Sequence, residues 1–168
     1  MPNTYTKIAS VSVSAALGAA SMDFTSIPAT YTDLLVKVSG RELTGVSLLF
    51  TMQINGVATN QTTREVRGSG SAASSGTNTI ATLDQNGSGT TASVFGSADI
   101  YIPNYASTST YKSISIDAAS ENNATAAYMR LSAALWSSNS AINQLTFYAS
   151  SGNIAQYSTA VLYGISKS

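Results

Sequence analysis

Hydrophobic and polar residues alternate along much of this 168-residue chain. In residues 33–40, for example, Leu34, Val36 and Val38 fall on one side of an extended backbone and Lys37 on the other. A period of two is typical of a β-strand with one buried face, because successive side chains of a strand point to opposite sides. The alternation therefore predicts a protein built from β-strands.

Runs of this kind recur along the chain, separated by clusters of Gly, Asn, Ser and Pro that favour turns. Strands so closely spaced are typical of a sandwich or a barrel. The sequence thus predicts a single all-β domain over residues 1–168, with nine or ten strands. We expect these strands at 5–14, 33–40, 46–54, 61–67, 77–83, 93–102, 111–119, 126–136, 142–149 and 157–165.

Two segments have little capacity to build a core. Residues 68–75 contain only Gly, Ser and Ala, and residues 84–91 are mainly small or polar. Such compositions favour flexible loops. We therefore expect two loops, with the weak strand at 77–83 between them. Within the second, residues 84–87 faintly resemble a calcium-binding loop, but the terminal bidentate Glu is missing, which favours a solvated turn.

One window also carries a helical signal. Residues 121–135 are rich in alanine, which is a strong helix former. Within this window, however, Met129, Leu131, Ala133 and Leu135 occupy every second position. That spacing favours a strand in which these four side chains share a face.

The segment 7–20 has the charged and apolar layout of a signal peptide. Its details favour a half-buried strand instead, because Ser10 and Ser12 alternate with Val11 and Val13. Nowhere does an apolar run approach the roughly 20 residues that a membrane helix requires. We therefore expect a soluble protein without a membrane partner.

Charged residues make up only 10% of the chain and its formal net charge is +0. Globular proteins carry about 25% charged residues. Most of the polarity comes from Ser, Thr and Asn, so little charge repulsion opposes self-association or docking. The basic residues form no block, which argues against nucleic-acid binding. This composition suits a subunit of a crowded assembly.

The chain contains neither His nor Cys, which removes the imidazole base, thiol nucleophiles and disulfides. Lys112 beside Ser113 is a conceivable dyad, but such neighbours are expected by chance in a Ser-rich chain. A glycosidase requires two carboxylates roughly 5–9.5 Å apart, and nothing in the sequence pairs them. We expect a non-enzymatic protein with no catalytic, metal-binding or cofactor-binding residues. The acidic residues are scattered: Asp23, Asp33, Glu42, Glu65, Asp84, Asp99, Asp117 and Glu121.

Tyrosine is the commonest aromatic residue, with nine copies. Tyr101, Tyr105 and Tyr111 lie close together in the sequence, and Trp136 ends an apolar run. Tyrosine combines an apolar face with a hydroxyl and is favoured at interfaces and on sugar-stacking surfaces. These four residues are candidate contacts for a partner protein or a glycan, and ordinary strand packing is the alternative.

Several segments of the sequence resemble a family of small virion proteins of tailed bacteriophages. The resemblance spans nearly the whole chain, although its motifs are structural and none is catalytic. The matching segments are Tyr5–Ser10, Phe24–Val38, Ile54–Gly56 with Arg64 downstream, Tyr101–Tyr105, Tyr111–Ser113, Leu135–Ser137, Ala141–Asn143 and Ser158–Ile165.

This resemblance implies a jelly-roll-like antiparallel β-sandwich of about eight to ten strands, assembled as a homotrimer. Two roles fit this resemblance, and the first is a capsid decoration (cement) protein that binds the outside of the shell, with the major capsid protein and itself as partners. The compact chain, which has no long fibrous shaft, and its neutral, polar surface favour this role. The alternative is a tail-associated or fibre protein, an adhesin domain that contacts host glycans. An enzyme ranks third. No cofactor is expected in any of these roles.

Overall fold

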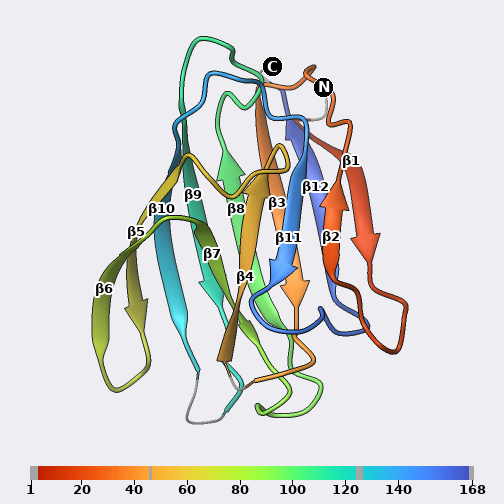
Figure 1. Ribbon diagram of the computed structural model, residues 1–168, viewed down its shortest axis with the longest axis vertical. Coiled ribbons are helices and arrows are strands. Elements are labelled where there is room, and N and C mark those ends of the chain that lie inside the picture. Colours follow the sequence, from red (N-terminus) through yellow and green to blue (C-terminus); the bar gives the residue numbers. More distant parts are fainter. Residues whose placement is uncertain (1–3, 46, 124–126, 167–168) are drawn as a thin grey trace.

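The structure is a computed structural model that describes residues 4–45, 47–123 and 127–166. These residues form two antiparallel sheets packed face to face, and no helix (Figure 1). The large sheet has the order β1 (Tyr5–Ser12), β12 (Thr159–Ile165), β3 (Asp33–Gly40), β8 (Gly96–Ile102), β9 (Lys112–Ala119), β10 (Met129–Trp136), β5 (Gln61–Gly68) and β6 (Ala73–Asn78). The small sheet has the order β2 (Ser21–Phe24), β11 (Leu145–Ala149), β4 (Ser47–Ile54) and β7 (Ala81–Asn86).

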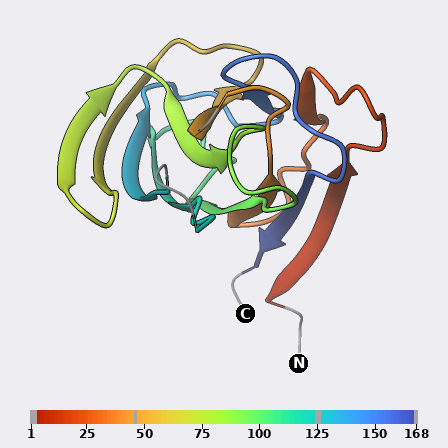
Figure 2. The same cartoon turned by 90° about the horizontal axis from the view of Figure 1, so that it is seen from below.

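The prediction of an all-β antiparallel sandwich is confirmed. The described chain has twelve strands, and its sheets contain eight and four of them. Figure 2 shows the β5–β6 hairpin at one end of the sandwich and strands β1 and β12 at the other. The large sheet thus extends beyond the small one at both ends, and its outermost strands have less cover.

The apolar residues predicted to share the buried face of β3 lie in the core. Val36 and Val38 of β3 and Ile116 of β9 face the small sheet, which contributes Phe50 and Phe147. All five side chains are at most 3% exposed. Full burial of such a side chain stabilises the fold by roughly 1.5–3 kcal/mol. In these strands the side that carries the alternating apolar residues becomes the core.

The two segments predicted to be loops are partly strands, so this prediction was partly wrong. The first contains only a short turn before β6 begins at Ala73, and the second begins inside β7, which extends to Asn86. Every residue of β7 is buried although four of the six are polar. Strands β5, β8, β9 and β10 of the large sheet contact β7, so this strand is covered on both faces. The calcium-like turn is accordingly part of this buried strand.

The remaining differences from the predicted strands are local. Strand β2 was not predicted, and it contains only four residues. The strand predicted at 5–14 ends at Ser12. The ambiguous window contains strand β10 rather than a helix, while residues 124–126, including the predicted start of this strand, lie outside the described residues. The described residues also include no helix long and apolar enough to span a membrane.

Two glycines face each other where β3 pairs with β8. A Cβ atom on Gly40 would collide with the ring of Phe50 and lie 2.8 Å from the Gln85 side-chain oxygen. A Cβ atom on Gly96 would lie 2.7 Å from that same oxygen. The glycine pair therefore provides the space in which the small sheet packs closely on the large one.

We predict that Gly40→Ala lowers the free energy of unfolding by about 1–3 kcal/mol, because the added methyl group overpacks this contact. Gly68→Ala is the matched control, since its Cβ would meet only the Met129 side chain at an ordinary 3.5 Å. Urea denaturation of the two variants measures the difference. Equal stabilities would contradict the role assigned to the glycine pair.

Candidate docking face

Four charged side chains form an ion-pair network between the two sheets. Arg130 on β10 bonds Asp84 on β7 and Glu65 on β5, each at 2.5 Å. Arg67 lies 3.3 Å from the other Asp84 oxygen and stacks its guanidinium on the ring of Tyr128. A buried charge is costly unless it is paired. The network therefore holds β7 against the large sheet and keeps these charges inside the fold.

The ammonium group of Lys112 is satisfied by the backbone. It donates to the carbonyl oxygens of Ser107 at 2.7 Å and Ser140 at 2.6 Å, and burial lowers the pKa of this lysine. It also lies 5.3 Å from the centre of the Trp136 ring. Ser113 points to the opposite, exposed side of β9. The two neighbours in sequence thus do not form a Ser–Lys dyad.

Glu42 is a buried carboxyl group at the end of β3. It accepts hydrogen bonds from the backbone N–H groups of Ser150 at 2.9 Å and Ser151 at 3.3 Å. Burial raises its pKa to about 7, although these hydrogen bonds oppose the rise. Within the described chain no ion pair involves this carboxyl group. Glu42 ties the loop after β11 to the large sheet.

Two acidic residues face each other across neighbouring strands of the large sheet. Asp99 on β8 lies opposite Asp117 on β9, and Lys37 pairs with Asp99 at 2.6 Å. Both carboxylates are open to solvent, unlike the buried acids that act as general acids in hydrolases. Nor do the described residues contain a group of three or more acidic side chains arranged to hold a metal ion.

The aromatic residues singled out in the sequence separate into two pairs. Tyr101 and Tyr111 reach the surface, with 39% and 57% of each exposed. Tyr105 and Trp136 are buried in the core, with 0% and 2% exposed. The three tyrosines therefore do not form one stacking surface, and the buried pair packs inside the chain.

Hydrogen bonds fix two of these tyrosines. The Tyr105 hydroxyl donates to the carbonyl oxygen of Pro28 and accepts a bond from the Tyr31 N–H at 3.4 Å. The exposed Tyr101 hydroxyl donates to Asp33 at 2.8 Å, and this bond raises the pKa of Tyr101. Tyr101 is thus oriented on the outer side of β8, where it remains accessible.

The outer face of the large sheet, turned away from the small sheet, carries an unusual set of exposed apolar residues. Met129, Leu131 and Leu135 of β10 are 64%, 53% and 38% exposed, and Val66 of β5 is 56% exposed. Val66 lies directly opposite Leu131, and Ala133 continues the row. These five residues form what we term the apolar stripe. Contiguous exposed apolar patches of a few hundred Å² on a monomer often mark interaction sites.

Strand β10 therefore has an inverted polarity. The residues that the sequence placed on one face do share a face, but it is the solvent face. Arg130, Ser132 and Trp136 occupy the buried face. The ion-pair network explains the inversion, because Arg130 reaches Asp84 only from the inner side. The sequence does contain one sign of this inversion. The large aromatic Trp136 alternates in phase with Arg130 and Ser132, and a residue of this size is expected on the buried face.

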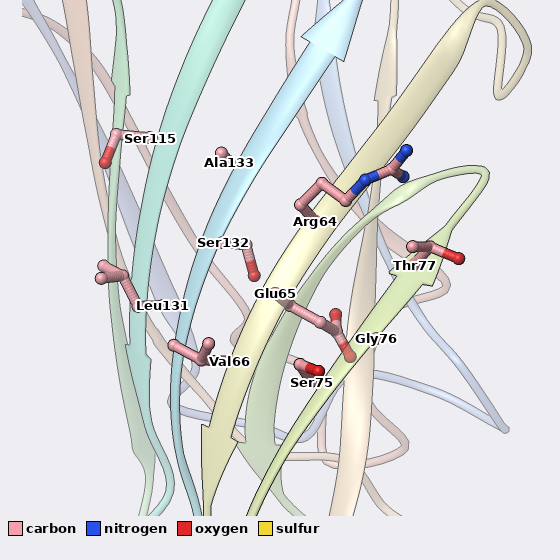
Figure 3. A pocket seen from close by; sticks show the side chains of 10 residues that line it. All are labelled: Arg64, Glu65, Val66, Ser75, Gly76, Thr77, Ser115, Leu131, Ser132 and Ala133. Atoms are coloured by element: carbon pink, nitrogen blue, oxygen red, sulfur yellow. The ribbon is translucent and has the colours of Figure 1, made fainter.

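A shallow hollow of about 690 Å³ lies along the apolar stripe. Figure 3 shows Val66, Leu131 and Ala133 on neighbouring strands of its floor, with Arg64 at the side nearest Thr77 of β6. The lining is mainly apolar or uncharged, and among the described residues the Arg64 guanidinium makes only a weak 3.5 Å contact, with the backbone oxygen of Thr63. A broad, open hollow of this kind favours contact with a protein surface over enclosure of a small molecule.

Comparison of the chain with protein families, curated proteins and solved structures gives no match in any of the three. The resemblance to phage virion proteins therefore stays a prediction from the sequence. The fold defines the class of the protein as an all-β sandwich.

Proposed function

We propose that this chain is a non-enzymatic structural protein of a bacteriophage particle, a capsid decoration protein that binds the outside of the shell. The apolar stripe carries the proposal, because it offers a docking surface on a rigid sheet. Its partner would be an uncharged, partly apolar surface of the major capsid protein. The sequence resemblance supplies the virion context, and the stripe supplies the contact.

The distribution of charge supports this role. Arg130, Asp84 and Lys112 are held within the fold, so these charges do not reach the surface. Binding through the stripe would therefore desolvate few charged groups, which favours contact over a broad area. Each docked copy would stabilise the assembled shell over its free subunits by mass action.

The rival proposal is an adhesin domain that stacks host glycans on tyrosines. Burial of Tyr105 leaves Tyr101 and Tyr111 for that role. A glycan array probed with the purified chain tests it, and binding lost in Tyr101→Ala would favour the adhesin. The copy number per particle also separates the two roles, because a decoration protein is present in numbers comparable to those of the major capsid protein.

We predict that Leu131→Lys weakens binding to shells that lack this chain by about ten- to a hundredfold, the usual effect of losing a central contact residue. The fold should persist, because the new side chain is exposed and faces Asp117 across the strand pair. Co-sedimentation of purified chain with shells from a phage deletion strain measures the affinity.

Ser10→Lys on β1 is the matched control, because Ser10 is exposed on the same sheet, far from the stripe. It should bind like the wild type. Shells without the chain should also lose integrity at a lower temperature than complete particles. Unchanged binding by Leu131→Lys, or unchanged heat tolerance of shells without the chain, would contradict the proposal.

A further inference from the structure

The two sheets have four edge strands: β1, β6, β2 and β7. An edge strand presents unpaired backbone N–H and C=O groups, which can pair with a strand of another chain. Folded proteins block such pairing with short strands, bulges, charged side chains or coverage by other segments. The four edges of this sandwich differ in whether they carry such protection.

Three of the edges are protected. Strand β1 has a register shift between Lys7 and Ala9, and Lys7 is exposed. Strand β2 has only four residues, and Asp23 is exposed in its middle. Strand β7 is buried along its whole length. Pairing with another chain is therefore disfavoured at each of these three edges.

Strand β6 carries none of these protections. It pairs with β5 over six residues, Ala73–Asn78, without a register shift. Its sequence, Ala-Ser-Ser-Gly-Thr-Asn, contains no charge and no proline. No residue of β6 is buried, and the hairpin projects from one end of the sandwich (Figure 2). The edge strand has a regular register, no charge and an accessible outer side.

We propose that β6 is a self-association edge, and that its occupant is β6 of a second copy of this chain. A two-fold axis perpendicular to the sheet would pair the two strands antiparallel. Only small, neutral side chains would then face one another, so the pairing involves neither a steric clash nor like charges. With a formal net charge of +0, the two copies also lack long-range repulsion.

This pairing would join the two large sheets into one continuous sheet of sixteen strands, eight from each copy. Because the axis is perpendicular to the sheet, both outer faces would point in the same direction. The apolar stripes of the two copies would remain exposed side by side. The inference stands without the proposed function, since it depends only on the edge, and two stripes on one side would suit binding to a shell.

The expected affinity is low. Six residues of strand pairing form an interface well below the roughly 1,200 Å² of stable complexes. A dissociation constant of about 0.1–1 mM corresponds to such a small contact. The dimer should therefore form at high protein concentration, or where many copies are held close together.

Sedimentation equilibrium of the purified full chain, from about 10 μM to about 1 mM, tests the inference. The wild type should show a monomer–dimer equilibrium. Ser75→Lys should weaken dimerisation by at least about tenfold, because the two-fold axis brings two copies of the new charge together on an edge strand. Ser10→Lys on β1 is the matched control and should dimerise like the wild type.

Hydrogen exchange locates the contact, since the amides of residues 73–78 should gain protection as the concentration rises. A chain that is monomeric over the whole range would overturn the inference. So would a dimer or a trimer that Ser75→Lys leaves unchanged, or protection gained at β1 instead of β6. Because the experiment uses the isolated chain, it does not depend on binding to a shell.

Discussion

Replacing Arg130 with methionine should lower the free energy of unfolding by about 3–5 kcal/mol, which is the usual effect of removing one partner of a buried ion pair. Arg130 is 2% exposed and Asp84 0%. Without Arg130, the closest cation to Asp84 is Arg67, at 3.3 Å. Glu65 would lose its ion pair as well. Urea denaturation at neutral pH measures the loss.

The control for this substitution is Lys37→Met, at an ion pair whose side chains are 52% and 47% exposed. Exposed pairs contribute about 0–1 kcal/mol, so the control should change stability by less than 1 kcal/mol. Both variants replace a cation with methionine, so they compare the loss of a solvated ion pair with the loss of a buried one. A similar loss in both variants would contradict the importance of the network.

A double variant keeps the prediction testable even if Arg130→Met alone fails to fold. Adding Asp84→Asn removes the buried charge that the first substitution leaves behind. The double variant should recover at least about 2 kcal/mol of the loss, because an unpaired buried charge costs more than an amide. If Asp84→Asn makes Arg130→Met still less stable, the loss does not come from an uncompensated carboxylate.

Stability should fall as the pH rises from about 5 to about 8, through the ionisation of Glu42. Its pKa is raised from 4.5 to about 7 in the folded protein. The folded state therefore holds a proton that the unfolded chain has already released, and this contribution is fully present below pH 4.5. It is lost as the pH rises through about 7. By thermodynamic linkage, this pKa shift changes the free energy of unfolding by at most about 3 kcal/mol between these pH limits.

This pH window is unusually clear because the chain has no histidine, the side chain that ordinarily titrates here. Glu42→Gln should remove most of the pH dependence, since it keeps an oxygen for the Ser150 and Ser151 N–H groups but cannot ionise. Glu121→Gln is the control, because Glu121 is exposed, and it should retain the wild-type slope. Urea denaturation at pH 5.5, 7 and 8 distinguishes the variants. A wild-type stability that is constant or increases over this range would refute the assignment.

The sequence by itself determined that the protein is all-β, with a sandwich or a barrel as the two architectures that its strand spacing allows. Val36 and Val38 are buried and Lys37 is exposed because neighbouring residues of a strand must point to opposite faces. That rule depends on the backbone alone, and it therefore holds wherever a strand forms. It also placed Met129 and Leu131 on one face of a single strand, which is where they lie.

What the local pattern cannot specify is which face of a strand the rest of the chain covers. Met129 and Leu131 became the outer face because Arg130 pairs with Asp84, a residue 46 positions away in the sequence. The second half of β7 was predicted to be a loop, because Asp84 finds its partners Arg67 and Arg130 only across the sandwich. Tyr105 is likewise buried through a distant partner, because its hydroxyl donates to the carbonyl oxygen of Pro28, 77 residues away in the sequence.

The protection of the sheet edges was likewise decided by the tertiary structure. Ala73–Asn78 has a composition typical of a loop, and it forms a strand because β5 provides a regular partner for its backbone. Whether its other edge is open depends on the strand order, which places β6 last in the large sheet. Alternation along the chain therefore determined most of the strands, and long-range pairing of charges and backbone groups decided which surfaces remain free to bind.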